Sequence, residues 1–210
     1  MFKIAETSKI TNRKASIYRK SIETDISLDL NLDSFEDGLK IYTGCGFLNH
    51  MLTLFAFHSG YSLCISASGD ADVDFHHLGE DLGMCLGKAV AQALGDKRGI
   101  HRYANISLPM DETLVNIAID ISGRGFLVFN VPFERDKVGE MDTEVVEEFF
   151  HAFVRTSGIT LHINMMYGKN THHIIEAIFK GFGRVLKEAT KIENYNNAVP
   201  SSKGIIDNSN

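Results

Sequence analysis

Apolar and polar residues alternate in two similar stretches of the chain. The first stretch covers residues 16 to 32 and the second covers residues 113 to 121. A period of two residues is typical of a β-strand with one buried face, so the pattern predicts a strand in each stretch. The apolar or β-branched positions are Ile22, Thr24, Ile26, Leu28, Leu30 and Leu32 in the first, and Val115, Ile117, Ile119 and Ile121 in the second.

Each alternating stretch is followed by the same series of elements. A second strand is predicted at 39 to 43 and at 126 to 131, then a helix at 47 to 59 and at 143 to 157. Gly60 and Gly158 come directly after these helices, at the left-handed position where helices often end. A further strand at 61 to 67 and at 159 to 167 leads to a second helix at about 75 to 95 and at 171 to 190.

The order strand, strand, helix, strand, helix therefore occurs twice, which indicates an internal duplication. We predict an α+β fold built from duplicated β-β-α-β-α halves, with sheets packed against helices. The predicted halves are residues 1 to 100 and 101 to 195, and residues 196 to 210 form a C-terminal tail.

A short phrase of histidines and a glutamate also occurs twice. His76-His77-Leu78-Gly79-Glu80 and His172-His173-Ile174-Ile175-Glu176 both open a predicted second helix. Residues three or four apart share a helix face, so a histidine and the glutamate of one phrase can converge on one metal ion. Adjacent histidines diverge by about 100° around a helix, so the two histidines of each phrase are better placed to serve different ions.

Alignment of the halves adds two more candidate ligands, His50 and Glu148, on the preceding helices. His162 is a competing ligand in the second half. Such ligands supply nitrogen and oxygen without sulfur, a set that suits manganese, iron or zinc and does not choose among them. A ligating histidine needs a partner for its other nitrogen, and Asp72, Asp74, Asp81 and Asn170 lie near the phrases. The predicted metal ligands are His50, His76, His77, Glu80, Glu148, His172, His173 and Glu176.

Composition excludes several classes of protein. A formal charge of -6 argues against a nucleic-acid binder, which usually presents a concentrated basic surface. The chain has no apolar run of about 18 residues and no basic-then-apolar leader, so neither a membrane span nor a signal peptide is expected. Three cysteines without C-x-x-C spacing indicate neither a disulfide framework nor a thiolate zinc site. We expect a cytoplasmic protein.

Anion-binding and acid-base residues are less sharply marked. Arg124 lies between glycines, which permit close backbone approach to a ligand, and its guanidinium can hold phosphate oxygens bidentately. Arg102, Lys180 and the tail segment Ser201-Ser202-Lys203-Gly204 are further candidates for binding an anion. The acid-base candidates are Glu23, on the polar face of the first predicted strand, and Asp111 and Glu112, at a strand entry; the sequence does not rank them.

Taken together, these segments resemble imidazoleglycerol-phosphate dehydratase, an enzyme family of histidine biosynthesis. The resemblance runs from about residue 14 to 206. It is carried by Glu23-Thr24, the segment from Thr43 to Leu52, Gly69-Asp70, both histidine phrases, Leu94-Gly95-Asp96-Lys97, Pro109-Met110-Asp111-Glu112, Asp120-Ile121-Ser122-Gly123-Arg124, Leu161-His162-Ile163, Phe179-Lys180 and Ser201-Ser202-Lys203-Gly204. Many members of the family carry histidine where this chain has Glu148.

The resemblance implies the ribosomal protein S5 domain 2-like fold, two Mn²⁺ ions per active site, and a homo-oligomer of 24 subunits with metal sites at subunit interfaces. It implies the dehydration of D-erythro-imidazole glycerol phosphate to imidazole acetol phosphate. Glu23 or Glu176 is then expected to transfer the proton. The residues expected to bind the substrate are Glu23, His50, His58, His76, His77, Glu80, Arg102, Arg124, Lys180, Ser201, Ser202 and Lys203.

Two other functions fit the same inventory of residues. A dinuclear metallohydrolase of a small phosphate ester would use a similar set of histidines and carboxylates. A non-enzymatic assembly protein would use the ions only to join subunits. The product formed from imidazole glycerol phosphate separates the dehydratase from the hydrolase.

Overall fold

The chain forms two four-stranded sheets of the same design. The computed structural model describes residues 13–36, 38–193 and 198–206. Their strand orders are β1-β2-β4-β3 and β5-β6-β10-β7, and the outer strands β3 and β7 run parallel to their neighbours. The first sheet and its helices are β1 (Lys14–Lys20), β2 (Thr24–Asn31), β3 (Leu39–Tyr42), α1 (Gly46–Ser59), β4 (Ser62–Gly69) and α2 (His76–Leu94). The second set is β5 (Tyr103–Met110), β6 (Thr113–Asp120), β7 (Phe126–Asn130), α3 (Glu144–Ser157), β10 (Thr160–Tyr167) and α4 (Thr171–Thr190). The duplicated α+β fold is confirmed.

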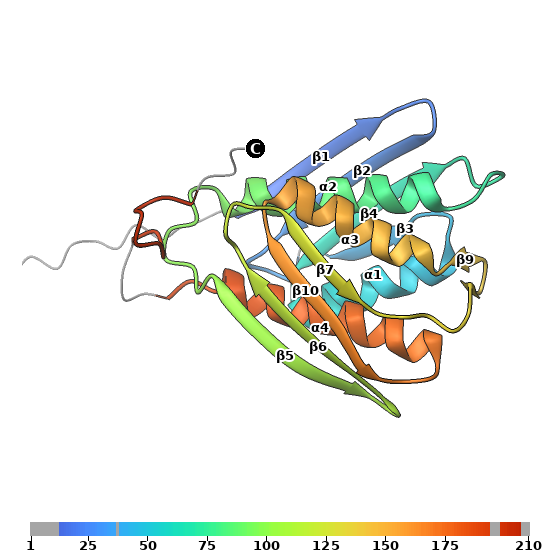
Figure 1. Ribbon diagram of the computed structural model, residues 1–210. Helices are drawn as coiled ribbons and strands as arrows, with labels where there is room; N and C mark the ends of the chain where they lie inside the picture. The colour runs from blue at the N-terminus through green and yellow to red at the C-terminus, as the bar shows by residue number, and fades with distance from the viewer. Residues whose placement is uncertain (1–12, 37, 194–197, 207–210) are drawn as a thin grey trace, which may run out of the picture.

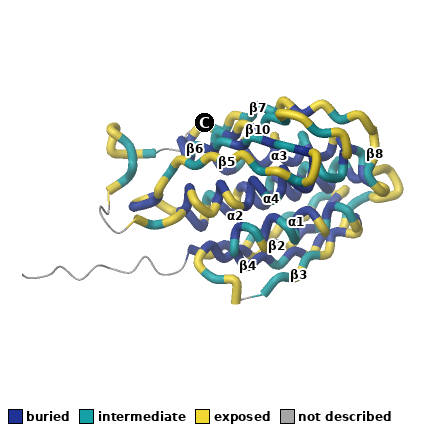
Figure 2. Tube along the Cα trace, turned by 90° about the horizontal axis from the view of Figure 1, so that it is seen from below, coloured by how far each residue is buried: buried dark blue, intermediate teal, exposed yellow. Residues whose placement is uncertain are grey.

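The helices lie in a layer between the two sheets (Figure 1). The inward faces of the strands carry the alternating apolar residues, and Ile26, Leu28, Ile117 and Leu161 are all fully buried. Figure 2 shows the same pattern, with the darkest segments running along the helices and the strand faces that cover them. Burial of apolar surface from both sheets onto one helical layer supplies the main driving force for folding.

The stretch from 16 to 32 is a hairpin of two strands, where we predicted one. Ser21 makes the turn, because its hydroxyl accepts hydrogen bonds from the backbone N–H groups of Glu23 and Thr24 at 3.2 and 3.0 Å. Ile22, which the alternation assigned to the buried face, is fully exposed in this turn. The inward-facing residues are odd-numbered in β1, as at Ala15 and Ile17, and even-numbered in β2, as at Ile26 and Leu28, so the alternation changes phase at the turn.

The matching strand of the second half, β5, was also missed. Its apolar residues Ala104, Ile106 and Leu108 are only half-buried, because β5 is an edge strand that covers α4 with one face. A two-residue hairpin pair, β8 (Lys137–Val138) and β9 (Met141–Asp142), lies before α3. The described part of the first half therefore contains one strand more than the predicted series, and that of the second half contains three more, β5, β8 and β9.

The predicted helix ends are confirmed at the first helix of each half. Gly60 and Gly158 follow α1 and α3 in the left-handed conformation, with φ of 69° and 67°. The helices pack in pairs, α1 on α4 and α2 on α3. In the described part of the chain, no helix combines the length and apolar character that crossing a membrane requires.

Close helix packing depends on glycines at the contact. A Cβ atom at Gly83 of α2 would lie 2.2 Å from the carbonyl oxygen of Phe149 in α3, and one at Gly183 of α4 would lie 2.6 Å from that of Phe55 in α1. Both approaches are too short for any side chain, so the backbones touch directly. These backbone contacts set the distance and orientation of the helices in each pair, and with them the positions of the polar residues near the helix starts.

The segment between α2 and β5 holds the C-terminal tail. The backbone N–H of Gly99 donates to the carbonyl oxygen of Ala198 at 3.0 Å, and Arg102 donates to that of Pro200 at 2.7 Å. Residues 196, 197 and 207 to 210 of the predicted tail lie outside the described residues. The remaining tail residues are held against the start of the second half.

Candidate metal and phosphate sites

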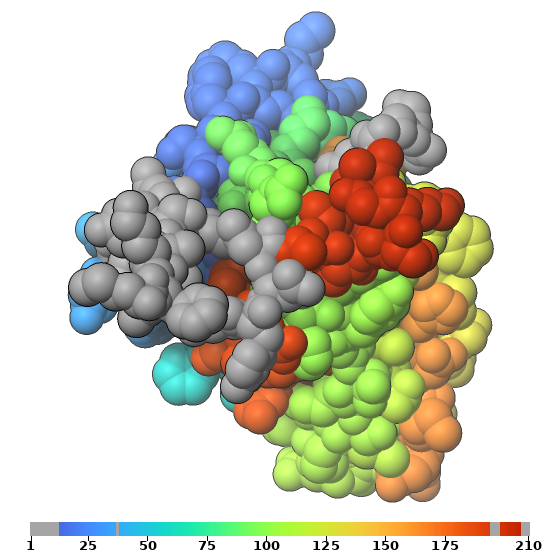
Figure 3. All heavy atoms as spheres, turned by 90° about the vertical axis from the view of Figure 1, so that its left-hand side faces the viewer, coloured from blue at the N-terminus to red at the C-terminus, as the bar shows by residue number. Residues whose placement is uncertain are grey.

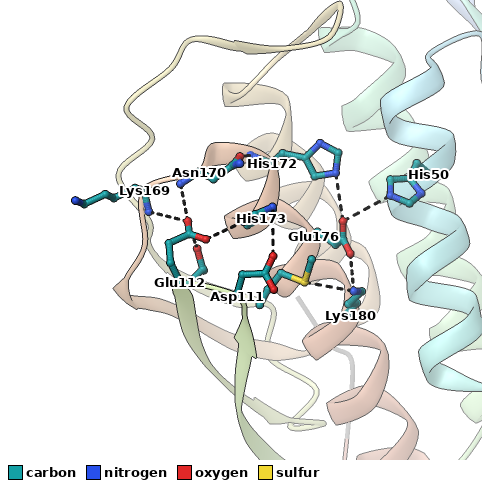
Figure 4. Close-up of polar contacts among 11 residues, drawn as sticks. His50, Asp111, Glu112, Lys169, Asn170, His172, His173, Glu176 and Lys180 are labelled. Atoms are coloured by element: carbon teal, nitrogen blue, oxygen red, sulfur yellow. Dashed lines mark hydrogen bonds and ion pairs between the residues drawn. The ribbon is translucent and has the colours of Figure 1, made fainter.

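Three candidate ligands converge where α1 packs on α4. His50 comes from α1, and His172 and Glu176 lie one turn apart on α4 (Figure 4). Nε2 of His50 lies 3.6 Å from Oε2 of Glu176, and Nε2 of His172 lies 3.2 Å from the same oxygen. One ligand atom from each residue lies within 4.8 Å of the others, a spacing that suits a single ion. Asn170 starts α4 by accepting a hydrogen bond from the backbone N–H of His172 at 3.0 Å.

The buried carboxylate of Glu176 is kept ionised by its surroundings. Burial acts to raise its pKa, but the Lys180 ammonium, 2.5 Å from Oε1, and the charges of His50 and His172 lower the pKa below its ordinary value. Lys180 also contacts the Met110 sulfur at 3.6 Å. An ionised glutamate beside two imidazoles is suited to bind a cation.

The equivalent residues of the other helix pair, α2 with α3, have different partners. Glu80 of α2 pairs with Arg155 of α3 at 2.8 Å, and His76 lies 3.9 Å from the Glu144 carboxylate. Glu148, the predicted counterpart of His50, is half-buried on α3 one turn after Glu144. The second predicted set therefore lies on two packed helices, with an arginine holding one of its carboxylates, and among the described residues only His50, His172 and Glu176 have the spacing for one ion.

The remaining histidines of the two phrases, His77 and His173, bond to carboxylates that belong to neither cluster. His77 Nδ1 lies 2.9 Å from the carboxylate of Asp70, and His173 Nδ1 lies 2.8 Å from that of Glu112. These hydrogen bonds raise the pKa of both rings. The bond from His173 lowers the pKa of Glu112. A carboxylate at Nδ1 is the arrangement usual for histidines that bind metals through Nε2, and in His173 that Nε2 lies 3.8 Å from the carboxylate of Asp111 (Figure 4).

The carboxylates that hold these rings differ from those expected. Asp81 is buried and accepts from the Thr24 hydroxyl at 2.6 Å, and Asp74 accepts from the backbone N–H of His76 at 2.7 Å. Asp72 is exposed, and Asn170 bonds the backbone of His172, not its ring. Asp70 and Glu112 both lie in motifs that carry the family resemblance, and this was the one indication in the sequence that they matter.

The candidate anion-binding residues meet at the opposite end of the molecule. Arg102, Arg124, Ser201, Ser202 and Lys203 line one cavity of about 510 Å³. Figure 3 shows the red tail spread beside the green start of the second half at this end. Arg102 is also fixed by Asp120, whose carboxylate lies 2.8 Å from Nε. Two guanidinium groups and two hydroxyls around one cavity suit a phosphate group.

Four other predicted residues lie outside the phosphate cavity. Glu23 is exposed in the β1–β2 turn, and His162 is exposed on the face of β10 that points away from the core. His58 lines a separate cavity of about 380 Å³ with Arg184, where burial and the nearby Lys180 and Arg184 charges lower its pKa. Lys180 pairs with Glu176 and does not line the cavity that holds the arginines.

Comparison with known proteins gives one consistent result. The family model described as imidazoleglycerol-phosphate dehydratase matches residues 43–186. The imidazoleglycerol-phosphate dehydratase of Clostridium botulinum is 56% identical over 93% of this chain and 99% of that protein. The one from Oceanobacillus iheyensis is 54% identical over 92% of this chain and 100% of that protein.

Solved structures agree with the sequence comparisons. The crystal structure of imidazoleglycerol-phosphate dehydratase from Staphylococcus aureus has a TM-score of 0.78 and 44% identity, covering 86% of this chain and 99% of that chain. The Pyrococcus furiosus structure, in complex with (S)-C348, has a TM-score of 0.78 and 35% identity over 90% of this chain and 99% of that chain. The matched length, identity and fold together show that this chain belongs to the imidazoleglycerol-phosphate dehydratase family.

Proposed function

We propose that the chain converts D-erythro-imidazole glycerol phosphate to imidazole acetol phosphate and water, a step of histidine biosynthesis. It acts as a carbon–oxygen lyase on this small phosphorylated imidazole. The observation that carries the proposal is the cluster of His50, His172 and Glu176, in a chain that matches whole members of the family. Neither the metallohydrolase nor the assembly-only alternative receives comparable support.

The donor set of this cluster fits a divalent metal ion. It offers two imidazole nitrogens and an ionised carboxylate, without sulfur, and Mn²⁺ is the ion we propose. A bound divalent ion would stabilise negative charge that develops on the substrate's imidazole ring during loss of the hydroxyl. A second ion is proposed at His76, Glu80 and Glu148, so that each active site holds two.

His77 and His173 are proposed to complete metal sites on neighbouring subunits. Each ring is held at Nδ1 by a carboxylate of its own chain that belongs to neither cluster. Their fixed orientation costs little entropy on binding, because the ring is already in place. Such sharing supports a homo-oligomer, for which the family resemblance implies 24 subunits.

The distance between the two sites supports the same conclusion. The metal cluster lies at the start of α4, and the phosphate cavity lies beside the tail that follows the end of α4 (Figure 1). At 1.5 Å per residue, a helix of 20 residues spans about 30 Å. One small substrate does not reach both, so we propose that the metal-binding groups of one subunit face the phosphate-binding groups of another.

Proton transfer is assigned to Glu23. The Glu176 carboxylate is already paired with the Lys180 ammonium and faces the imidazoles of His50 and His172, whereas Glu23 is exposed in a turn and its charge helps to raise the pKa of His77. The carbon beside the imidazole loses its hydroxyl, and Glu23 removes the proton from the next carbon. The resulting enol rearranges to the ketone, and the hydroxyl and proton leave as water.

Purified protein with Mn²⁺ tests this function directly. The expected product from imidazole glycerol phosphate is imidazole acetol phosphate, identified by mass spectrometry, with activity lost on chelation and restored by Mn²⁺. Release of inorganic phosphate without the ketone would overturn the proposal in favour of a hydrolase. We also propose a cytoplasmic location, consistent with the free thiols of Cys45, Cys64 and Cys85.

A further inference from the structure

Lys97 is a buried lysine that no part of the proposed chemistry uses. It lies just after α2, and only 4% of its surface is exposed. Its backbone has a φ of 59°, a left-handed conformation that side-chain-bearing residues rarely adopt. Burial of an ammonium group and an unfavourable backbone conformation both cost free energy. Their coincidence in one residue points to a specific requirement for the ammonium group at this place.

The ammonium of Lys97 is directed to the C-terminal tail. Nζ donates to the carbonyl oxygen of Ile206 at 3.2 Å. The backbone N–H of Lys97 bonds the carbonyl of Leu94 at 3.1 Å, so the base of the side chain is itself fixed to the end of α2. Ile206 lines the same cavity as Ser201, Ser202 and Lys203.

The bond from Lys97 to Ile206 helps to hold in place the turn that carries Ser201, Ser202 and Lys203. The turn at residues 201 to 204 closes with a bond from the N–H of Gly204 to the carbonyl of Ser201 at 2.9 Å. Before the turn, Gly99 and Arg102 bond the carbonyls of Ala198 and Pro200. After the turn, Lys97 bonds the carbonyl of Ile206, so the segment between α2 and β5 holds both ends of the turn.

We propose that Lys97 is a positioning residue for the phosphate cavity, holding the turn that presents Ser201, Ser202 and Lys203. It acts through the tail backbone and does not touch the substrate. This inference rests on the proposed role of the cavity in binding the substrate phosphate. Whether Lys97 holds the tail is measured independently of substrate binding, by trypsin cleavage.

The test compares Lys97→Met with Lys88→Met in the assembled enzyme. Lys97→Met keeps most of the apolar length of the side chain and removes the donor, whereas Lys88 is exposed on α2 and controls for the loss of one positive charge. The substitution removes the charged hydrogen bond to Ile206, so KM for the substrate should rise roughly tenfold with kcat nearly unchanged. Lys97→Gln, which restores a donor without the charge, should recover part of the affinity. Lys88→Met should match the unmodified enzyme.

Two further measurements separate the parts of the inference. Trypsin cleavage after Lys203, followed by mass spectrometry, should be faster in Lys97→Met than in the control if the tail is released. In a chain that ends at Gly204, which lacks the Ile206 acceptor, Lys97→Met should raise KM little further. An equal rise in both chains would show that Lys97 acts by its charge, and unchanged cleavage together with unchanged KM would overturn the proposal. Faster cleavage with unchanged KM would leave Lys97 as the tail anchor and instead refute the phosphate-binding role of the tail.

Discussion

The two helix pairs carry the same phrase of ligands in different electrostatic surroundings. In the α1/α4 pair, Glu176 is buried and its neutralising cation, Lys180, comes from the same helix. In the α2/α3 pair, Glu80 is one-third exposed, and its cation, Arg155, comes from the opposite helix. Met84 takes the place of Lys180, eight residues after the first histidine of its phrase.

The difference shows what a duplicated fold preserves and what it leaves free. Both pairs keep the backbone contact through glycine and the positions of the ligands on the helices. The charges around the carboxylates have changed independently. We therefore expect the two proposed metal sites to respond differently to equivalent substitutions.

The largest difference should come from removing the carboxylate of each site. Loss of a partner that only orients a ligand costs 10–100-fold, so loss of a direct ligand in Glu176→Gln should lower kcat by more than about a hundredfold. The variant also leaves the largely buried Lys180 ammonium without its closest carboxylate, so the melting temperature should fall. Steady-state kinetics, metal analysis and thermal unfolding measure these effects.

Glu80→Gln is the matched variant of the other pair. It should also lower kcat and the metal content, but the melting temperature of the metal-free protein should change little, because the exposed pair with Arg155 contributes little stability. A Glu176→Gln enzyme with full metal content and activity would refute the ligand assignment. Equal loss of stability in both variants would refute the difference between the pairs.

The next effect concerns the carboxylates that hold His77 and His173. Glu112→Gln and Asp70→Asn each leave a neutral side chain in place of the charged partner of one ring. Because such partners orient a ligand and increase its basicity, the Mn²⁺ affinity of the affected site should fall by about 10–100-fold at pH 8. Isothermal titration calorimetry on chelator-treated protein measures the affinity.

The pH dependence separates this role from a merely structural one. Hydrogen bonding to Glu112 raises the pKa of His173, and a protonated ring does not ligate, so metal affinity falls as the pH is lowered through that raised pKa. In Glu112→Gln the pKa of His173 returns toward its ordinary value, so the fall should begin at lower pH. A curve displaced in the other direction would contradict the assigned role of Glu112.

Much of the fold was readable from the sequence because the core faces alternate strictly. Strands β6 and β10 and all four helices were predicted within a few residues, since their buried faces are complete. The Ser21 turn was missed because Ile22, in the turn, continues the even-numbered apolar series of β2, although β1 directs its odd-numbered residues inward. Strand β5 was missed because an edge strand buries its apolar residues only partly.

The sequence predicted which residue types form the site, but it did not predict which side chains contact one another there. The repeated phrase gave the candidate ligands, and helical spacing indicated that neighbouring histidines serve different ions. The pairing of α1 with α4, which joins His50 to Glu176, arises from tertiary packing through Gly183. The roles of Asp70, Glu112, Arg155 and Lys97 also depend on contacts far apart in the chain, which local patterns do not contain.

Substitution of Gly83 and Gly183 should show how much stability is lost when the two helices of each pair are forced apart. In Gly83→Ala the new methyl would meet the Phe149 carbonyl at 2.2 Å, and in Gly183→Ala it would meet the Phe55 carbonyl at 2.6 Å. Overpacking of this kind costs about 1–3 kcal/mol, with the larger loss expected at Gly83. Thermal unfolding of the metal-free protein ranks the two. Gly46→Ala is the control, because Gly46 has no neighbouring atom within 4 Å and no positive φ, and a larger loss at Gly183 than at Gly83 would refute the expected order.

The smallest effect should come from Arg155→Met, which frees the Glu80 carboxylate. An ion pair at this level of exposure is worth about 0.2–1 kcal/mol, so the Mn²⁺ affinity of the α2/α3 site should rise by no more than about fivefold. Calorimetry should show no change at the α1/α4 site, whose carboxylate has no contact with Arg155, and Lys88→Met controls for the lost charge. A fall in affinity would mean that Arg155 orients Glu80 for the metal and does not compete with it. In that case Arg155 of α3 would position Glu80 of α2, just as Lys180 positions Glu176 within α4.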